Sequence, residues 1–233
     1  MSWLTVTFGL YRRTLARAAA LTRRNWPVLG SLFVYSVAMS MAMALAPALG
    51  LLGGFLLSFV WAACVGSFLY LVEMLVRTSR VTLDDFRRSA GAYLWDVVGV
   101  TFVVWLAFRL LAPVLAPVPQ GPMLLFGLNL VILVFFNAVP ELIYLGRCSS
   151  LELLGQSYAF IGENWIEWFP LTLALGALVL GVAALPVAPL LGWLKLALVA
   201  LLVSFTMVAR GILFLELHGS SRRSRAFRHR MGG

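Results

Sequence analysis

The sequence has very little charge. Only 12% of its 233 residues are Asp, Glu, Lys or Arg, whereas 62% are hydrophobic. A soluble domain has about a quarter of its residues charged and roughly half of them apolar. This composition excludes a water-soluble globular domain, a disordered tail and a fibrous repeat. Most of the apolar residues therefore belong in a lipid bilayer.

Cysteine and histidine are also scarce. The two cysteines, Cys64 and Cys148, cannot form a disulfide framework, and neither His218 nor His229 has a second metal ligand nearby. The sequence also lacks the Gly-x-Ser-x-Gly, His-Glu-x-x-His, phosphate-loop and dinucleotide-binding motifs. We therefore expect no metal, no cofactor and no catalytic residue, and the chain is predicted not to be an enzyme.

Six apolar stretches are long enough, or nearly so, to cross a bilayer core of about 30 Å as helices. Short connections rich in proline and glycine join them in pairs, which predicts three antiparallel hairpins. The fold class expected is all-α: a polytopic bundle of six transmembrane helices forming one membrane domain over residues 1–233. The stretches are Pro27–Ala46, Leu51–Val76, Val97–Ala116, Met123–Leu145, Phe169–Leu185 and Leu190–Leu217.

Basic residues predict the orientation. Five arginines precede the first stretch, four follow the second, one follows the fourth and five lie in the tail 222–233. The hairpin turns have only Arg109 and Lys195, both near span ends, and Arg210 lies inside the last span. The positive-inside rule then predicts a multi-pass protein of the bacterial cytoplasmic (inner) membrane with both termini, and so the basic tail, in the cytoplasm. Such flanks attract membrane lipids with anionic headgroups, and we expect no nucleic acid partner.

The sequence contains three copies of one repeating unit. Trp26, Trp95 and Trp165 each precede a hairpin and are separated by 69 and 70 residues. The repeats cover residues of about 1–79, 80–150 and 151–221. Each consists of an interfacial amphipathic helix, a span, a turn and a second span. The three tryptophans are predicted to anchor the chain at the membrane interface.

Helical spacing and capping signals indicate the interfacial helices. In the first repeat the predicted apolar stripe contains Leu4, Phe8, Tyr11, Leu15, Ala18 and Thr22, and in the third it contains Leu151, Leu154, Tyr158, Ile161 and Trp165. Capping boxes are predicted at Thr82–Asp85 and at Ser149–Glu152. Such helices either lie in the interface or pack on a soluble partner, and the chain's membrane character favours the interface.

Ionisable residues inside spans are the candidate functional residues. Glu73, Glu141 and Arg210 fall at nearly the same height in the second span of each hairpin, 45 to 47 residues after the repeat's tryptophan. With Asn137 they form a candidate intramembrane polar cluster. Its functional interpretation is a proton or ion relay or a polar cavity, and its structural interpretation is a charge cluster that fixes helix register. Pro140 predicts a kink in the fourth span.

The stretch from Asn137 to Trp165 carries a resemblance to a known family. It consists of a span with an acidic residue, a short linker and an amphipathic helix in which Ser157 precedes Trp165 by eight residues. This pattern resembles the membrane domain of bacterial glycerophosphoryl diester phosphodiesterase-like proteins and their stand-alone inner-membrane relatives. Ser89 and Trp95 match loosely, and the first repeat has Ala18 where the serine would fall. The resemblance implies six helices in the inner membrane and no activity of its own.

Two functions remain open. The first is a scaffold or accessory subunit in envelope or lipid homeostasis, with a protein partner in the membrane. The alternative is a small permease or the membrane subunit of an ATP-driven transporter, with an ATPase subunit as partner. Three equal hairpins favour the first function, because such a permease need not show them.

Overall fold

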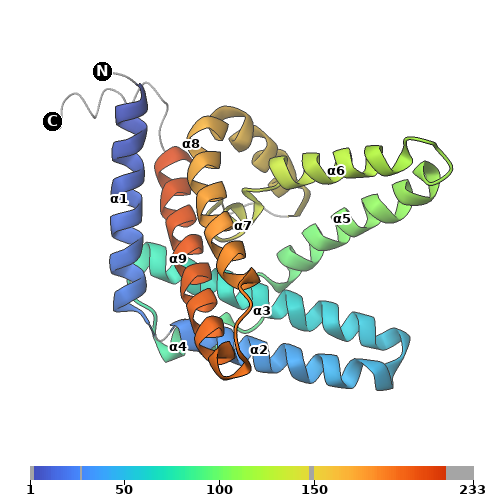
Figure 1. Ribbon diagram of the computed structural model, residues 1–233, viewed down its shortest axis with the longest axis horizontal. Helices are drawn as coiled ribbons and strands as arrows, with labels where there is room; N and C mark the ends of the chain where they lie inside the picture. The colour runs from blue at the N-terminus through green and yellow to red at the C-terminus, as the bar shows by residue number, and fades with distance from the viewer. Residues whose placement is uncertain (1–2, 27, 147–149, 219–233) are drawn as a thin grey trace. The chain divides into compact units, whose positions relative to one another are not determined.

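The computed structural model describes residues 3–26, 28–146 and 150–218, and every regular element within them is helical (Figure 1). The chain forms two compact units. Unit 1 comprises Met1–Ala38, Leu71–Arg87 and Asn164–Gly233, and unit 2 comprises Met39–Tyr70 and Arg88–Glu163. The predicted tail 222–233 lies outside the described residues.

Five helices are long and apolar enough to cross a membrane, and a sixth span results if a bent pair of helices is counted as one. For the described residues this confirms the prediction of an all-helical chain with several helices long and apolar enough to cross a membrane. The five helices are α2 (Val28–Leu45, extended by the 3-10 turn η1, Ala46–Leu49), α3 (Leu51–Thr78), α5 (Leu94–Leu115), α8 (Ser150–Ala184) and α9 (Gly192–His218).

The bent pair is the predicted fourth span. Helix α6 (Gly121–Phe135) stops before α7 (Val139–Glu141), which continues into the π-helical turn η2 (Leu142–Gly146), and the two parts meet at 40°. Pro140 lies in the first turn of α7, where its missing N–H leaves no hydrogen bond unmade. The predicted kink is confirmed, and the helix breaks just before the proline.

The helices over residues 150–184 differ from those predicted for the third repeat. We expected an interfacial helix that ends near Trp165 and a separate span that begins at Phe169. Instead α8 is one helix of 35 residues, about 52 Å long, and Pro170 lies inside it without ending it. Ser149, the predicted cap of this helix, lies outside the described residues.

In the second repeat the predicted capping box is confirmed. The backbone N–H of Thr82 donates to Asp85 Oδ2 at 2.8 Å, and the N–H of Asp85 donates to Thr82 Oγ1 at 3.2 Å. Helix α4 (Leu83–Ser89) follows at once and ends after seven residues. The chain then turns through Gly91 and Tyr93, both with positive φ, into α5.

Helix α1 (Trp3–Arg24) packs along α9 within unit 1 (Figure 1). Its buried stripe contains three threonines, one alanine and two leucines: Thr7, Leu10, Thr14, Ala18, Leu21 and Thr22. From Phe8 onward, the predicted stripe has Ala18 and Thr22 buried, whereas Phe8 is 73% exposed. The buried face is thus displaced by about one residue, because small side chains let two helices approach closely and Phe8 would hold them apart.

Candidate functional site

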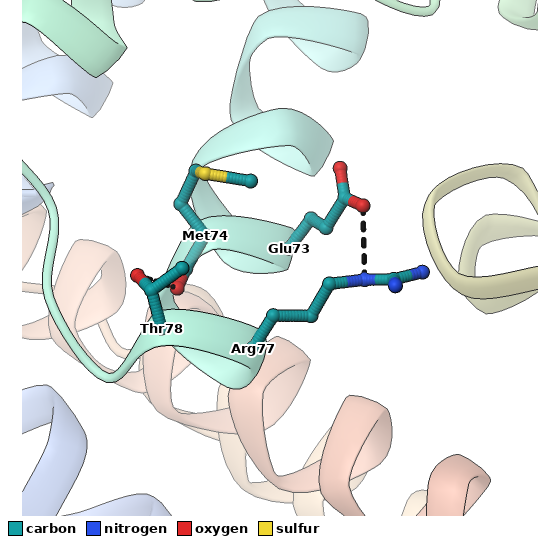
Figure 2. Close-up of polar contacts among 4 residues, drawn as sticks. All are labelled: Glu73, Met74, Arg77 and Thr78. Carbon is teal, nitrogen blue, oxygen red and sulfur yellow. Dashed lines mark hydrogen bonds and ion pairs between the residues drawn. The ribbon is translucent and has the colours of Figure 1, made fainter.

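Glu73 ends up in an ion pair on its own helix. Arg77 Nε lies 3.0 Å from Glu73 Oε1, one turn further along α3 (Figure 2). The acid precedes the base by four residues, which is the more favourable order on a helix. Thr78 Oγ1 lies 2.7 Å from the Met74 carbonyl oxygen and 2.8 Å from that of Arg80, at the end of the helix. Arg77 therefore neutralises the charge of Glu73 where α3 leaves the apolar stretch.

Arg210 lies over an aromatic ring. Its guanidinium carbon is 5.3 Å from the ring centroid of Trp168, which brings α9 against α8 inside unit 1. Trp168 is fully buried and meets Phe214 edge to face at 6.5 Å between ring centroids. Phe214 in turn stacks on His218 at 5.0 Å. A cation over an indole is stabilised by the negative face of the ring, and this stabilisation grows as water is excluded.

The neighbouring acid, Glu167, was missed by sequence reasoning. It is 3% exposed, and its backbone carbonyl accepts a hydrogen bond of 2.7 Å from the Tyr11 hydroxyl of α1. Glu167 stands two residues before the predicted fifth span, and so outside the stretches in which ionisable residues are the candidates. The available sequence signal for burial of Glu167 is its apolar neighbourhood: Trp168 follows it directly, and Leu171 follows it by one helical turn.

Unit 1 therefore contains a polar layer that joins three helices, formed by Tyr11 of α1, Glu167 and Trp168 of α8, and Arg210 of α9. Glu73 belongs to the same unit, whereas Glu141 and Asn137 belong to unit 2. The meeting of Glu73, Glu141 and Arg210 in one cluster stays a prediction.

Glu141 is the most deeply buried acid of unit 2. It has no exposed surface and lies in α7, next to the buried residues Val139 and Leu142. Asn137 is half-buried at the break between α6 and α7, and its backbone N–H donates to the Val134 carbonyl at 3.4 Å. A buried carboxylate beside a broken span is typical of functional positions in membrane proteins.

The three predicted anchor tryptophans are all exposed. Trp26, Trp95 and Trp165 are 69%, 70% and 55% exposed, whereas Trp168, only three residues after the last of them, is fully buried. Exposure of large aromatic rings is what a position at the membrane interface requires. Their contact with lipid stays a prediction.

Small residues six or eight positions before these tryptophans are fully buried. Ala18, Ser89 and Ser157 each have no exposed surface. In unit 2 the hydroxyls of Ser67 and Ser89 are 2.5 Å apart, and Ser157 donates to the Phe135 carbonyl at 2.6 Å. Each serine thus reaches a residue 22 positions earlier, in the second helix of the preceding hairpin.

The contact between Ser67 and Ser89 depends on its neighbour Gly66. A Cβ atom at Gly66 would overlap the Ala92 carbonyl oxygen and lie 3.1 Å from the backbone nitrogen of Leu94. We expect Gly66→Ala to lower the free energy of unfolding by about 2 kcal/mol, because the backbone of the α4–α5 turn must shift. The change is measured by reversible denaturation in detergent.

Gly54, on the same helix α3, provides the control. A Cβ at Gly54 meets nothing within 4 Å. Gly54→Ala should therefore leave stability unchanged or raise it by up to about 1 kcal/mol through helix propensity. Equal losses in the two variants would contradict the close approach at Gly66.

Asn25 connects two loops of unit 1. Its side-chain amide donates to the carbonyls of Leu21 at 3.0 Å and Ser79 at 3.2 Å, and its Oδ1 accepts from the N–H of Val81 at 3.1 Å. Asn25 is 7% exposed. The asparagine before the first repeat tryptophan therefore ties the end of α1 to the segment that leaves α3.

The tie between Tyr11 and Glu167 should be visible in a titration. Burial raises the pKa of Tyr11 from its ordinary value of 10.0 to about 12, and the negative charge of Glu167 is the second cause. The tyrosinate absorbance lost in Tyr11→Phe should therefore titrate with a midpoint near 12. Because the unfolded tyrosine ionises first, the stability that neutral Tyr11 contributes is complete below pH 10 and is lost as the pH rises through about 12. A midpoint near 10 would contradict the partly buried position of the Tyr11 hydroxyl beside Glu167.

Within residues 3–26, 28–146 and 150–218, no three His, Cys, Asp or Glu side chains come together in a way that could hold a metal ion. Comparisons with protein-family models, curated proteins and solved structures found no match.

Proposed function

We propose that this chain is a multi-pass protein of the bacterial cytoplasmic membrane that acts as a scaffold or accessory subunit in envelope or lipid homeostasis. Both termini lie in the cytoplasm, and the chain has no catalytic site. It is built of three repeats, as in the membrane domain of glycerophosphoryl diester phosphodiesterase-like proteins. The positive-inside distribution of arginines supports the orientation. The shared burial of Ala18, Ser89 and Ser157, and the shared exposure of the three anchor tryptophans, support the repeat.

The observation that carries the subunit function is the exposed second hairpin. In α5 only Val97 is buried, whereas ten residues of α9 are buried. Helices α5 and α6 follow one another in the chain (Figure 1) and contact one another within unit 2. Large apolar side chains on both helices are exposed. Among them, Phe102 and Trp105 stack at 5.9 Å between ring centroids. Because this hairpin contributes few buried side chains to unit 2, its exposed apolar surface is available to bind the helices of a partner.

The test is purification in a mild detergent followed by mass spectrometry of the copurifying proteins. The wild type should retain a membrane partner, and a variant with Phe102→Ala and Trp105→Ala should lose at least about nine-tenths of it, since aromatic anchors dominate binding energies. The control variant, Phe55→Ala with Trp193→Ala, removes one exposed Phe and one exposed Trp elsewhere. It should retain the partner. Equal retention by all three proteins would exclude binding through α5.

The broken fourth span favours a second candidate, a small permease or the membrane subunit of an ATP-driven transporter. Discontinuous helices with buried polar groups line substrate paths in transporters, and Glu141 lies fully buried next to such a break. An ATPase copurifying in equal amount would favour the transporter over the scaffold. A Glu141→Gln variant that lost ATPase stimulation while retaining the ATPase would place Glu141 on the transport path.

A further inference from the structure

The outer face of α1 carries an unusual excess of positive charge. Arg12, Arg13, Arg17, Arg23 and Arg24 are all exposed, and the helix contains no acidic residue. None of the five guanidinium groups forms an ion pair with another described residue. Arg12, Arg13 and Arg23 lie opposite the stripe that packs on α9, and Arg17 and Arg24 lie along one edge of it. The exposed ring of Phe8 lies one turn before Arg12. This face is complementary to a surface of negative charge.

Within the described part of the chain, helices α1 and α9 each contain a buried hydroxyl group that is left unsatisfied. The hydroxyls of Thr22 on α1 and Ser204 on α9 are buried and have no hydrogen-bond partner among the described residues. In unit 2 the buried serines Ser89 and Ser157 do have such partners, whereas α1 has Ala18 at the corresponding repeat position. The hydrogen bond from Tyr11 to the Glu167 carbonyl connects α1 to α8. A buried hydroxyl without a partner disfavours the docked state.

When α1 is docked on α9, its arginines lie at different depths in the bilayer. Helix α9 crosses the membrane and α1 runs along it (Figure 1), so the two share roughly one tilt. Arg12 and Arg24 are then separated by about 18 Å along the helix axis. The headgroup region of one leaflet is only about 5 to 8 Å thick. A docked α1 cannot bring all five arginines to the headgroups, whereas a helix lying flat can.

We propose that α1 exchanges between its docked position on α9 and a position flat on an anionic bilayer, with phospholipid headgroups as the ligand of its arginines. In the flat position the face that leaves α9, with Leu10 and Leu21, enters the acyl region, and the arginines lie at headgroup level. The inference rests on the proposed membrane location of the chain. Helix α1 would then occupy both the interfacial position indicated by the sequence and the docked position seen in the structure.

The test measures the distance between α1 and α9 in the full chain by pulsed electron spin resonance. Spin labels are placed at the exposed positions Ala16 and Leu215 through Ala16→Cys and Leu215→Cys, with both native cysteines replaced by serine. In phosphatidylcholine bilayers we expect one short distance. In bilayers with one third phosphatidylglycerol at least about half of the molecules should move to a longer distance, and high salt should reverse the shift by screening.

Two variants and a control complete the test. Changing the five α1 arginines to glutamine should reduce the longer-distance population at least about fivefold, whereas Arg87→Gln with Arg88→Gln should leave it unchanged. Tyr11→Phe should increase that population even in phosphatidylcholine. Identical distances in both bilayers, or equal shifts in the two arginine variants, would overturn the exchange. Reconstituted bilayers carry the anionic lipid in both leaflets, so this outcome does not depend on the partner or orientation proposed above.

Discussion

Replacing Trp168 by alanine is expected to lower the free energy of unfolding by about 4 kcal/mol. The indole is fully buried, carries the Arg210 guanidinium over its face and meets Phe214 at its edge. Its removal leaves a cavity between α8 and α9 and takes away the aromatic surface that accommodates the charge of Arg210. The measurement is reversible denaturation in mixed micelles, followed by far-ultraviolet circular dichroism.

Trp165 provides the matched control, one turn earlier on the same helix. Because it is 55% exposed, Trp165→Ala should change the free energy of unfolding by less than about 0.5 kcal/mol. The same substitution should instead reduce the protection of this segment by lipid, since Trp165 is predicted to lie at the interface. If the two variants were equally stable, Trp168 could not be at the centre of the contact between α8 and α9.

The second large effect is expected at Asn25. Asn25→Ala removes three hydrogen bonds and leaves the Ser79 carbonyl and the Val81 N–H without their side-chain partner. We expect a loss of about 3 kcal/mol in the free energy of unfolding, because buried polar groups left unsatisfied carry the cost of desolvation. Proteolysis should also become faster at the α3–α4 connection, which Asn25 holds in place.

Asn129→Ala is the control that separates the loss of these hydrogen bonds from the loss of an asparagine as such. Asn129 is exposed on α6, and its side chain donates only to the Leu125 carbonyl of its own helix, at 3.3 Å. Asn129→Ala should change the free energy of unfolding by less than about 0.5 kcal/mol. A comparable loss in both variants would show that Asn25 does not tie α1 to the segment after α3.

Much of the fold follows from the sequence, because a bilayer permits few solutions for a chain so poor in charge. Long apolar stretches must become helices, since their backbone groups find no other hydrogen-bond partner in lipid. Pro140 predicts the bend in the fourth span, and Thr82 with Asp85 predicts the start of α4, because both signals act locally.

The face of α1 that packs on α9 could not be predicted from apolar spacing. Helices that contact one another in membranes use small residues, whereas a stripe of large apolar side chains suits lipid equally well. The pattern therefore selected Phe8, which is exposed, and passed over Thr7 and Thr14, which are buried. The sequence signal for this face is the pair Thr7 and Thr14, because residues seven apart lie on the same side of a helix.

The polar layer of unit 1 was only partly predicted, for a related reason. Arg210 was selected because it stands inside an apolar run, but its contact with Trp168 depends on how α8 and α9 face one another. The sequence does not single out Glu167, because this residue lies outside the predicted fifth span. In the structure its side chain is nonetheless buried, with 3% of its surface exposed. Hydropathy reports how far a residue lies from the middle of an apolar run and does not report what neighbouring helices bury.

We propose that three hairpins cross the membrane with their turns on one side and their junctions on the other. Single cysteines test it in a chain without Cys64 and Cys148, at Ala48, Gln120 and Ala188 in the turns and at Arg17, Arg80 and Glu152 in the junctions. In intact cells stripped of their outer membrane, an impermeant maleimide should label all three turn positions. It should label the junction positions only after the membrane is permeabilised. Labelling of any junction position from outside, or protection of one turn, would contradict the account.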